Sequence, residues 1–370
     1  MTQKPVVSSN HDNSTEFEGK EFPFVSIIIT GHNERDTIEK CIMSLFQQTY
    51  PNFEIIYIDS KSSDGTFEIA ARLKNSLSLY ENCKCYLALS QEQASSPAKG
   101  RNYGVKISSG TIIAFIDADC IPEMNWLENL VRQFSDDTRV VGGPNILKHR
   151  RVSKILDAID NVLGTYLASG GSAQFMKIDK PSCVRAPSGA NMAIERNLFW
   201  EIGGFDEGLR YNEDSDLGHK LRKKGHKILY TPEAPVSHFM GMESYFGFLR
   251  IFKEYGYQRG RNVIKRPWLW TKSTLFSFGY AVAFILLLTT SIIFEVNEAL
   301  APFLILLPFS IVLIASAKLA AKKRSPLLLV LGPVIYISIY STYNFSFILG
   351  YTAEVIDIIK ARLNSMYLRK

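Results

Sequence analysis

Three clusters of polar residues follow short apolar runs, at points where β-strands are expected to end. They are Thr30-Gly-His-Asn-Glu34, Asp59-Ser-Lys-Ser-Ser-Asp-Gly-Thr66 and Asp117-Ala-Asp119. Any one of them could be ordinary turn and helix-cap sequence, because Asp, Ser, Asn and Gly are common at such positions. In open α/β sheets, however, ligands bind at the carboxyl ends of the strands. Three clusters on one sheet edge therefore favour a ligand site there.

Asp117 and Asp119 form the pair with the clearest chemistry. Two carboxylates that close an apolar strand repel each other and raise each other's pKa. A hard divalent cation removes this repulsion, and Mg²⁺ in proteins usually takes one or two carboxylates together with phosphate oxygens. The pair therefore predicts a metal-bound diphosphate, with a capped turn before Pro122 as the alternative. The chain has neither a GxGxxG motif after its first apolar run nor a GxxxxGK[ST] motif, which argues against a Rossmann dinucleotide site and a P-loop.

The elements that position these clusters alternate between strand and helix patterns. Short runs rich in Ile and Val predict buried strands at 24–30, 53–58, 86–89 and 111–116. The segments between them predict helices at 34–48, 67–77 and 98–108. This βαβαβαβ order predicts an α/β fold with an open parallel sheet and right-handed crossovers.

Residues 25–66 (VSIIITGHNERDTIEKCIMSLFQQTYPNFEIIYIDSKSSDGT) resemble the opening of family 2 glycosyltransferases, which have the GT-A fold. The resemblance continues through SPAKGRNYGVKISSGTIIAFIDADC, PSGANMAIERNLFWEIGGFDE and NEDSDLGHKLRKKGHKILYTPEAPVSH, in the family's order and spacing. It implies a GT-A domain over 23–242, an open, mainly parallel sheet with helices on both faces. It also implies a nucleotide-sugar donor, inversion at the anomeric carbon, and Mg²⁺ or Mn²⁺ as cofactor.

The resemblance assigns roles to individual residues. Eight match the family's nucleotide-sugar-binding positions: Thr30, Glu34, Asp59, Lys99, Arg101, Asp117, Ser188 and Gly189. Among them, Asp59 would hydrogen-bond the base, and Lys99 and Arg101 would contact the nucleotide or its diphosphate. Asp119 would bind the metal, with Asp117 in the ribose or metal shell. His238 would join the metal, although a lone His at such a position is often structural.

Asp214 matches the family's general base. Inverting transfer is one in-line displacement, so a carboxylate must accept the acceptor proton on the face opposite the leaving group. Cations must stabilise the departing nucleoside diphosphate. Glu213 and Asp216 are the alternatives for the base, and an acidic helix start favoured by the macrodipole is the structural reading of all three.

The processive members of the family carry a QxxRW motif after the base, and here the region reads Gln258-Arg-Gly-Arg-Asn262. A Trp at the last position would stack on a sugar of the growing polymer. Its absence argues against a processive polysaccharide synthase. The presence of Asp59, Asp117, Asp119 and Asp214 argues against a non-catalytic membrane scaffold of the same fold.

Composition divides the 370 residues into regions of different character. The mean hydropathy of 0.00 combines an ordinary soluble sequence up to 272 with long uncharged stretches after it. The length and the 46% apolar content exclude a disulfide miniprotein, a collagen-like repeat and a wholly disordered chain. Residues 1–22 are a polar tail, expected to be disordered. The five cysteines contain no CxxC pair and are expected to be reduced thiols.

The C-terminal third predicts a membrane region. Residues 243–272 carry seven Lys and Arg among aromatic residues, typical of interfacial helices on an anionic leaflet rather than of nucleic-acid binding. Spans are expected at about 274–294, 299–317 and 326–350, followed by a basic tail. Basic residues at 318–324 predict a multi-pass protein of the cell membrane whose catalytic domain faces the cytoplasm. Three spans would leave the basic tail outside, unless the second segment is re-entrant.

Together these features predict a membrane-bound, metal-dependent, inverting glycosyltransferase. Its acceptor is expected to be lipid-linked, either a polyprenyl phosphate or a lipid-linked glycan, in cell-surface polysaccharide or glycoprotein glycan assembly. The anchor motivates this acceptor class, because a lipid carrier presents its head group at the membrane surface. The sequence indicates neither the sugar nor the oligomeric state.

Overall fold

A computed structural model describes residues 22–77, 87–91, 96–176, 178–272 and 301–367, together with seven positions between 274 and 289. The polar tail predicted at 1–22 lies outside these residues except for Phe22, and so does most of the first predicted span.

The centre of the fold is an eight-stranded sheet with the order β3-β2-β1-β4-β9-β6-β10-β8. Its first half is parallel and contains β1 (Val25–Gly31), β2 (Phe53–Asp59), β3 (Leu87–Gln91) and β4 (Ile112–Asp117). These are the four strands that the apolar runs predict. Gly31 lies opposite Asp59 and Thr30 lies opposite Asp117, so that the polar clusters meet at one edge.

The second half of the sheet consists of shorter strands. They are β6 (Val140–Gly142), β8 (Ser182–Cys183), β9 (Asn191–Glu195) and β10 (Leu229–Tyr230). β9 runs antiparallel to both β4 and β6, which makes the sheet mixed. A separate three-stranded sheet contains β5 (Cys120–Pro122), β7 (Asn145–Leu147) and β11 (Val236–His238). In it, His238 pairs with Cys120, next to the end of β4.

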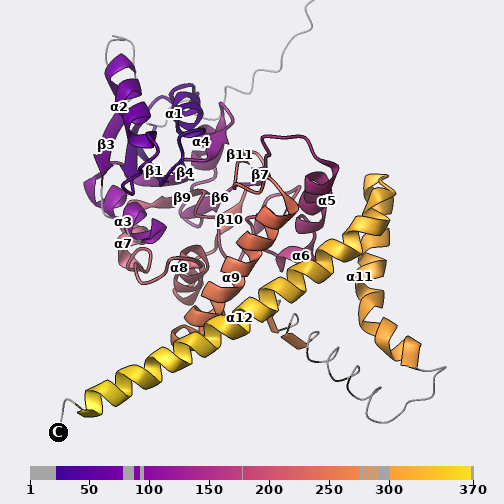
Figure 1. Cartoon of the computed structure of the whole chain (residues 1–370). Helices are drawn as coiled ribbons and strands as arrows, with labels where there is room; N and C mark the ends of the chain where they lie inside the picture. Colours follow the sequence, from indigo (N-terminus) through magenta and orange to yellow (C-terminus); the bar gives the residue numbers. More distant parts are fainter. Residues whose placement is uncertain are drawn as a thin grey trace, which may run out of the picture.

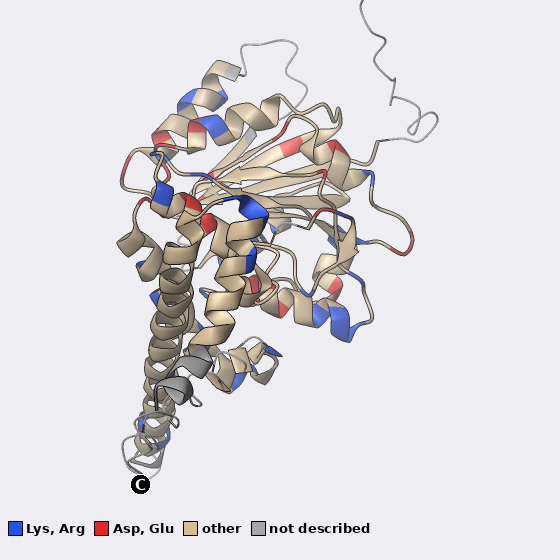
Figure 2. Ribbon diagram, turned by 90° about the vertical axis from the view of Figure 1, so that its right-hand side faces the viewer, with Lys and Arg blue, Asp and Glu red and all other residues tan. Residues whose placement is uncertain are grey.

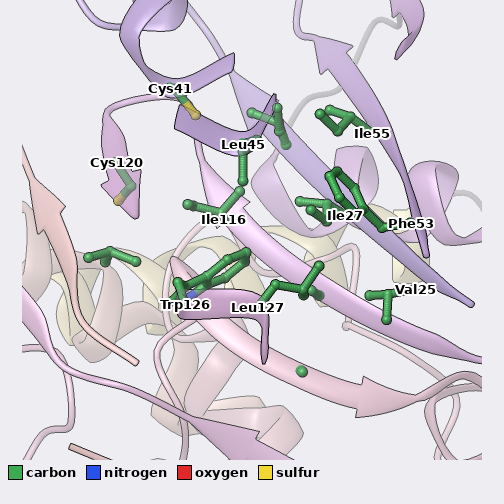
Figure 3. Close-up of a cluster of buried hydrophobic side chains, with 14 of the residues drawn as sticks. Val25, Ile27, Cys41, Leu45, Phe53, Ile55, Ile116, Cys120, Trp126 and Leu127 are labelled. Carbon is green, nitrogen blue, oxygen red and sulfur yellow. The ribbon is translucent and has the colours of Figure 1, made fainter. Parts of the chain in front are cut away.

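Helices cover both faces of the large sheet, as the resemblance implies. On one face lie α1 (Ile38–Phe46), α2 (Thr66–Leu77) and α4 (Trp126–Val131). Figure 3 shows part of the core beneath them, where Leu45, Trp126 and Leu127 pack against strand residues. On the other face lie α3 (Pro97–Ile107), α7 (Arg196–Glu201) and α8 (Glu213–Lys223). β1, β2 and β4 are therefore almost wholly buried, which explains their continuous apolar sequence.

The remaining helices build a third hydrophobic core beside the sheet (Figure 1). They are α5 (Lys154–Leu163), α6 (Tyr166–Ser169), α9 (Tyr245–Lys265), α11 (Ala301–Lys323) and α12 (Leu327–Tyr367). The short 3₁₀ helix η1 (Pro267–Leu269) follows α9. The basic aromatic segment predicted as interfacial helices is thus mainly one helix, α9, and it packs along α12.

Glycines allow α9 and α12 to touch through their backbones. A Cβ atom added at Gly256 would lie 2.3 Å from the carbonyl oxygen of Tyr343, and one at Gly260 would lie 2.1 Å from that of Phe347. From the other side, a Cβ at Gly350 would lie 2.0 Å from the carbonyl oxygen of Tyr257. Small residues at such a crossing let helix backbones approach closely.

Within the described part of the chain, one helix is long and apolar enough to cross a membrane. It runs from Leu327 to Ser365, with a mean hydropathy of 1.4 in its most apolar window. This helix contains residues 327–350 of the third predicted span, 326–350, and continues beyond it, while residues 301–317 of the second predicted span, 299–317, lie in α11. Figure 2 shows the long C-terminal helix as mostly uncharged ribbon.

Candidate active site

A cavity of about 810 Å³ opens at the carboxyl ends of β1 and β4. Its walls come from the sheet edge, from loops at 167–175 and 185–190, and from α8, α9 and α12. Ten of the twelve residues predicted for the site line it: Thr30, Glu34, Arg101, Asp117, Asp119, Ser188, Gly189, Glu213, Asp214 and His238. One cavity thus collects the predicted metal ligands, the predicted base and most of the predicted donor contacts.

Asp119 and His238 form the best candidate metal site. The Asp119 carboxylate lies 3.2 Å from Nε2 of His238, and these ligand atoms and the Cys120 sulfur all lie within 4.8 Å of one another. Burial opposes the protonation of His238, but the charge and the hydrogen bond of Asp119, together with the charges of Asp117 and Glu34, raise the pKa of this imidazole. Burial also raises the pKa of the Cys120 thiol well above its usual value, so that the carboxylate and the imidazole are the donors that fit a cation.

The negative charge around this pair also favours a cation. Thr30 donates a 3.4 Å hydrogen bond to Asp117, and Glu34 lines the same wall. Burial, followed by the charge of Asp119, raises the pKa of Glu34 to about 8. Three carboxylates thus share a wall with one arginine, Arg101, which pairs with Asp117, and a divalent ion such as Mg²⁺ or Mn²⁺ fits such a set.

Arg101 joins two parts of the site. Its guanidinium lies 2.6 Å from the Asp117 carboxylate and 2.8 Å from that of Glu213, and its side chain is only 4% exposed. Gly189 passes directly over it, because a Cβ there would lie 2.9 Å from the guanidinium. The sequence predicts a contact between Arg101 and the nucleotide or diphosphate. In the structure this guanidinium is instead paired with two protein carboxylates.

Glu213 and Asp214 begin α8 at the cavity wall. The backbone N–H of Ser215 donates a 2.6 Å hydrogen bond to the Asp214 carboxylate, and Glu213 is held by Arg101. Burial raises the pKa of Asp214 above its usual range, and it raises that of Glu213 to about 7. Asp214, which has no ion pair in the described part of the chain, is the better placed of the two to accept a proton.

Gln174 links the loop at 185–190 to the candidate metal site, and the sequence did not predict this role. Ser188 donates a hydrogen bond to the side-chain oxygen of Gln174, whose amide nitrogen lies 3.5 Å from Nδ1 of His238. No motif marks this glutamine, because it lies in an irregular segment far along the chain from its partners.

Asp59 and Lys99 lie outside the cavity. Asp59 is fully buried, and its carboxylate accepts hydrogen bonds from Tyr57, Ser62 and Gln91. Lys99 lies on the exposed side of α3. Asp59 lies at the same sheet edge, opposite Gly31, but neither of these two side chains lines the cavity, and their donor-binding roles stay predictions.

Another part of the cavity lining is a largely aromatic wall, called the aromatic wall below. It is formed by Phe252 and Tyr255 of α9 and by Ile339, Tyr340 and Tyr343 of α12. Sequence reasoning missed these residues because it treated the last apolar stretch as an anchor only. A usable signal was present: tyrosines at 336, 340 and 343 recur at helical spacing in the middle of an apolar segment, whereas membrane helices concentrate them at their ends.

The two arginines of the Gln258–Asn262 region point in different directions. Arg259 lines the cavity and donates a 3.1 Å hydrogen bond to the carbonyl of Leu269. Arg261 faces α12, where it pairs with Glu354 at 2.8 Å and Asp357 at 2.7 Å. α9 therefore contributes a cationic side chain to the cavity. This side chain is Arg259 and not Arg261, which occupies the position of the arginine in the QxxRW motif.

Comparisons with known proteins agree with this geometry. Residues 26–203 match the family described as Glycosyl transferase family 2. Glycosyltransferase AglE of Haloferax volcanii is 41% identical over 124 residues, which are 33% of this chain and 39% of AglE. The match therefore spans well under half of that relative.

Two further proteins match over most of their length. A dolichyl N-acetyl-alpha-D-glucosaminyl phosphate 3-beta-D-2,3-diacetamido-2,3-dideoxy-beta-D-glucuronosyltransferase of Methanococcus voltae is 25% identical over 337 residues, 88% of this chain and 97% of that enzyme. Among solved structures, the mannosyltransferase PcManGT of Pyrobaculum calidifontis, in complex with GDP-Man and Mn²⁺, superposes with a TM-score of 0.56 and 19% identity, covering 87% of each chain. The fold is thus that of the GT-A glycosyltransferases.

Proposed function

We propose that this glycosyltransferase, whose residues 26–203 match glycosyl transferase family 2, takes a sugar from a nucleotide-sugar and transfers it, with inversion, to a lipid-linked acceptor at a membrane surface. The observation that carries the proposal is the single cavity that joins the carboxylate edge of the sheet to the aromatic wall of α9 and α12. A polar donor and the head of an apolar acceptor can meet in such a cavity. The name of the Methanococcus voltae relative, which acts on a dolichyl-linked sugar, supports the acceptor class.

In this proposal Asp214 is the general base. It accepts the proton of the acceptor hydroxyl as the new glycosidic bond forms. Glu213 remains the alternative. Asp119 and His238 would hold Mg²⁺ or Mn²⁺, with Asp117 beside them, and the ion would offset the charge of the nucleoside diphosphate leaving group. Ser188 and Gly189 line the cavity in a loop that contacts Gln174 and Arg101, and they would face the donor sugar.

We further propose that the protein is a multi-pass membrane protein whose cavity faces the cytoplasm, where nucleotide-sugars are made. The apolar helix Leu327–Ser365 supports membrane association. The uncharged stretch within 274–294 and the basic residues at 318–324, at the end of α11, support additional spans in that orientation.

The test uses the full chain purified in detergent. We expect a UDP- or GDP-sugar to raise the melting temperature only when Mn²⁺ or Mg²⁺ is present, and Asp119→Ala to abolish this metal-dependent shift. Transfer is then measured to polyprenyl phosphate and to polyprenyl-linked saccharides, and the anomeric configuration of the product is determined by NMR. Unchanged metal dependence in Asp119→Ala, or a product with retained configuration, would contradict the proposal.

A further inference from the structure

Two arginines line the cavity at the far end of α8, away from the candidate metal site. Gly218 allows the chain at Arg185 to lie directly on this helix, because a Cβ there would come within 2.6 Å of the Arg185 carbonyl oxygen and of the Ala186 side chain. Arg222 follows one turn later. The absence of a side chain at Gly218 thus brings the two arginines together.

Neither arginine has a carboxylate partner among the residues that the structure describes. Nη1 of Arg222 is buried and has no hydrogen-bond partner within the same residues. Burial and the neighbouring charge of Arg185 both lower the pKa of Arg222. Buried donors without partners are rare in folded proteins, and two like charges side by side favour an anion between them.

The position of the pair limits what this anion is. Arg222 follows Asp214 by eight residues, a rise of roughly 12 Å along the helix axis, so that an anion bound at Arg222 is set apart from the proposed base. The adjoining cavity wall contains Trp268, Thr271 and Thr274, where the chain enters the first predicted span. Trp268 is held in place by stacking on His219, with ring centroids 5.0 Å apart. The pair therefore lies on the side of the cavity that adjoins the predicted membrane region.

We propose that Arg185 and Arg222 bind a phosphate group of the lipid-linked acceptor. This inference rests on the proposed function and selects between its two acceptor classes. The reacting hydroxyl lies on a saccharide, which separates it from the phosphate, rather than on the phosphate of a bare polyprenyl phosphate. The lipid then leaves the cavity past residues 268–274.

The test measures binding of geranylgeranyl diphosphate to the full chain in detergent, with the donor site saturated by Mn²⁺ and a nucleoside diphosphate. We expect Arg185→Gln and Arg222→Gln each to weaken this binding roughly ten- to a hundredfold, the loss of a charge-assisted hydrogen bond. Arg222→Lys should retain part of the affinity. Lys223→Gln, which removes an exposed charge from the same helix turn outside the cavity, should change nothing. Nucleotide affinity and binding of geranylgeraniol should be the same in all variants.

Several outcomes would overturn the inference. Weaker nucleotide binding in the arginine variants would assign the pair to the donor diphosphate. Equal weakening for geranylgeraniol would mean a general structural effect, and equal affinity for inorganic pyrophosphate would mean a site for free phosphate. Glycosylation of bare polyprenyl phosphate on its phosphate oxygen would contradict the acceptor class. If Arg222→Gln does not fold, the test rests on Arg185→Gln, because the Arg185 side chain is exposed. A wild-type protein that binds no nucleotide would instead reject the proposed function itself.

Discussion

Arg101 has the most constrained environment of the basic residues in the cavity. It joins Asp117, at the end of β4, to Glu213, at the start of α8, through two short ion pairs in a nearly buried position. Glu213, which precedes the proposed base, is thereby tied to the strand that ends two residues before the proposed metal ligand Asp119. Under the proposed function, Arg101 would position groups of the catalytic site on β4 and on α8.

We expect Arg101→Gln to destabilise the protein by about 3–5 kcal/mol, because it leaves two partly buried carboxylates without their partner. Thermal unfolding of the full chain measures this change. Arg139→Gln is the matched control, since it breaks the more exposed pair with Glu195, and it should cost at most about 1 kcal/mol. Similar losses for both variants would show that the buried pairing is unimportant.

Asp214→Asn tests the assignment of the base. The change is nearly isosteric and removes only the proton acceptor, so that single-turnover transfer should fall by roughly two to four orders of magnitude while donor affinity stays constant. Asp216→Asn is the control, because that carboxylate is 1% exposed and bonded to Lys220 and Trp268. It should lower stability more than turnover. If Glu213→Gln instead removes turnover, Glu213 is the base.

The pH dependence of turnover follows from the burial of Asp214. Burial raises the pKa of Asp214 above the ordinary aspartate value of 3.8. A general base acts only when deprotonated, so activity should rise with pH through this elevated pKa, with its acid limb above the range of an exposed aspartate. A profile of kcat against pH measures the limb. Asp214→Glu should keep such a limb, and a flat profile from pH 4 upward would contradict a buried base.

Elements with long, regular patterns could be predicted from the sequence, and short ones could not. The predicted strand 111–116 and helix 98–108 agree with β4 and α3 to within one residue at either end. β8 and β10 contain two residues each, too few for any periodicity to be visible. Their pairing depends on the surrounding fold, because the sheet edge is completed only by contacts far apart along the chain.

Site residues on strand ends were predictable for the same reason, whereas those on helices were harder to choose. Asp117 and Asp119 lie where β4 must end, at the edge where ligands bind. Arg259 and Arg261 differ by two positions, about 200° around a helix, so that only one can face the cavity. The sequence contains no feature that decides which. The aromatic wall depends on how α12 packs against α9, and that packing is tertiary information.

The crossing of α9 and α12 leads to a prediction for the helices themselves. We expect Gly260→Leu to force the two helices apart, because even a Cβ atom would lie 2.1 Å from the Phe347 carbonyl oxygen. Tyr343 would then move out of the cavity wall, with loss of transfer to a lipid acceptor and a lower melting temperature. Nucleotide binding should persist. Gly279→Leu is the control, since nothing lies within 4 Å of its added Cβ. Equal effects of the two substitutions would show that the close contact between α9 and α12 does not shape the cavity.

As a whole, the molecule does not divide into a catalytic unit and a separate anchor. Leu156, Ile159 and Val162 of α5 belong to the predicted GT-A domain, yet they pack in one core with α9, α11 and α12. Tyr336 and Tyr340 of α12 are hydrogen-bonded to Thr165 and to the carbonyl of Leu167, respectively. α9 and α12 therefore complete the cavity of the candidate active site as well as contributing apolar surface.

The orientation of the whole molecule can be tested with Cys183, which is exposed, whereas Cys41 and Cys120 are buried. With Cys83 and Cys85 replaced by Ser, a membrane-impermeant maleimide should label Cys183 only after intact cells are opened. This result is expected because the catalytic domain is proposed to face the cytoplasm. Cys183→Ser is the control that should not be labelled. Labelling of Cys183 in unopened cells would show that the catalytic domain faces outward instead.

The backbone contacts at Gly256, Gly260 and Gly350 have a mechanical consequence. Two helices separated by side chains can slide past each other as those side chains change rotamer, but helices in backbone contact have no such compliant layer. The long apolar helix α12 and the cavity-lining helix α9 must then tilt together as one rigid body. A thicker or thinner bilayer would rotate the catalytic cavity relative to the membrane plane instead of loosening its wall, so that lipid acyl-chain length becomes a means of adjusting how the cavity meets its acceptor.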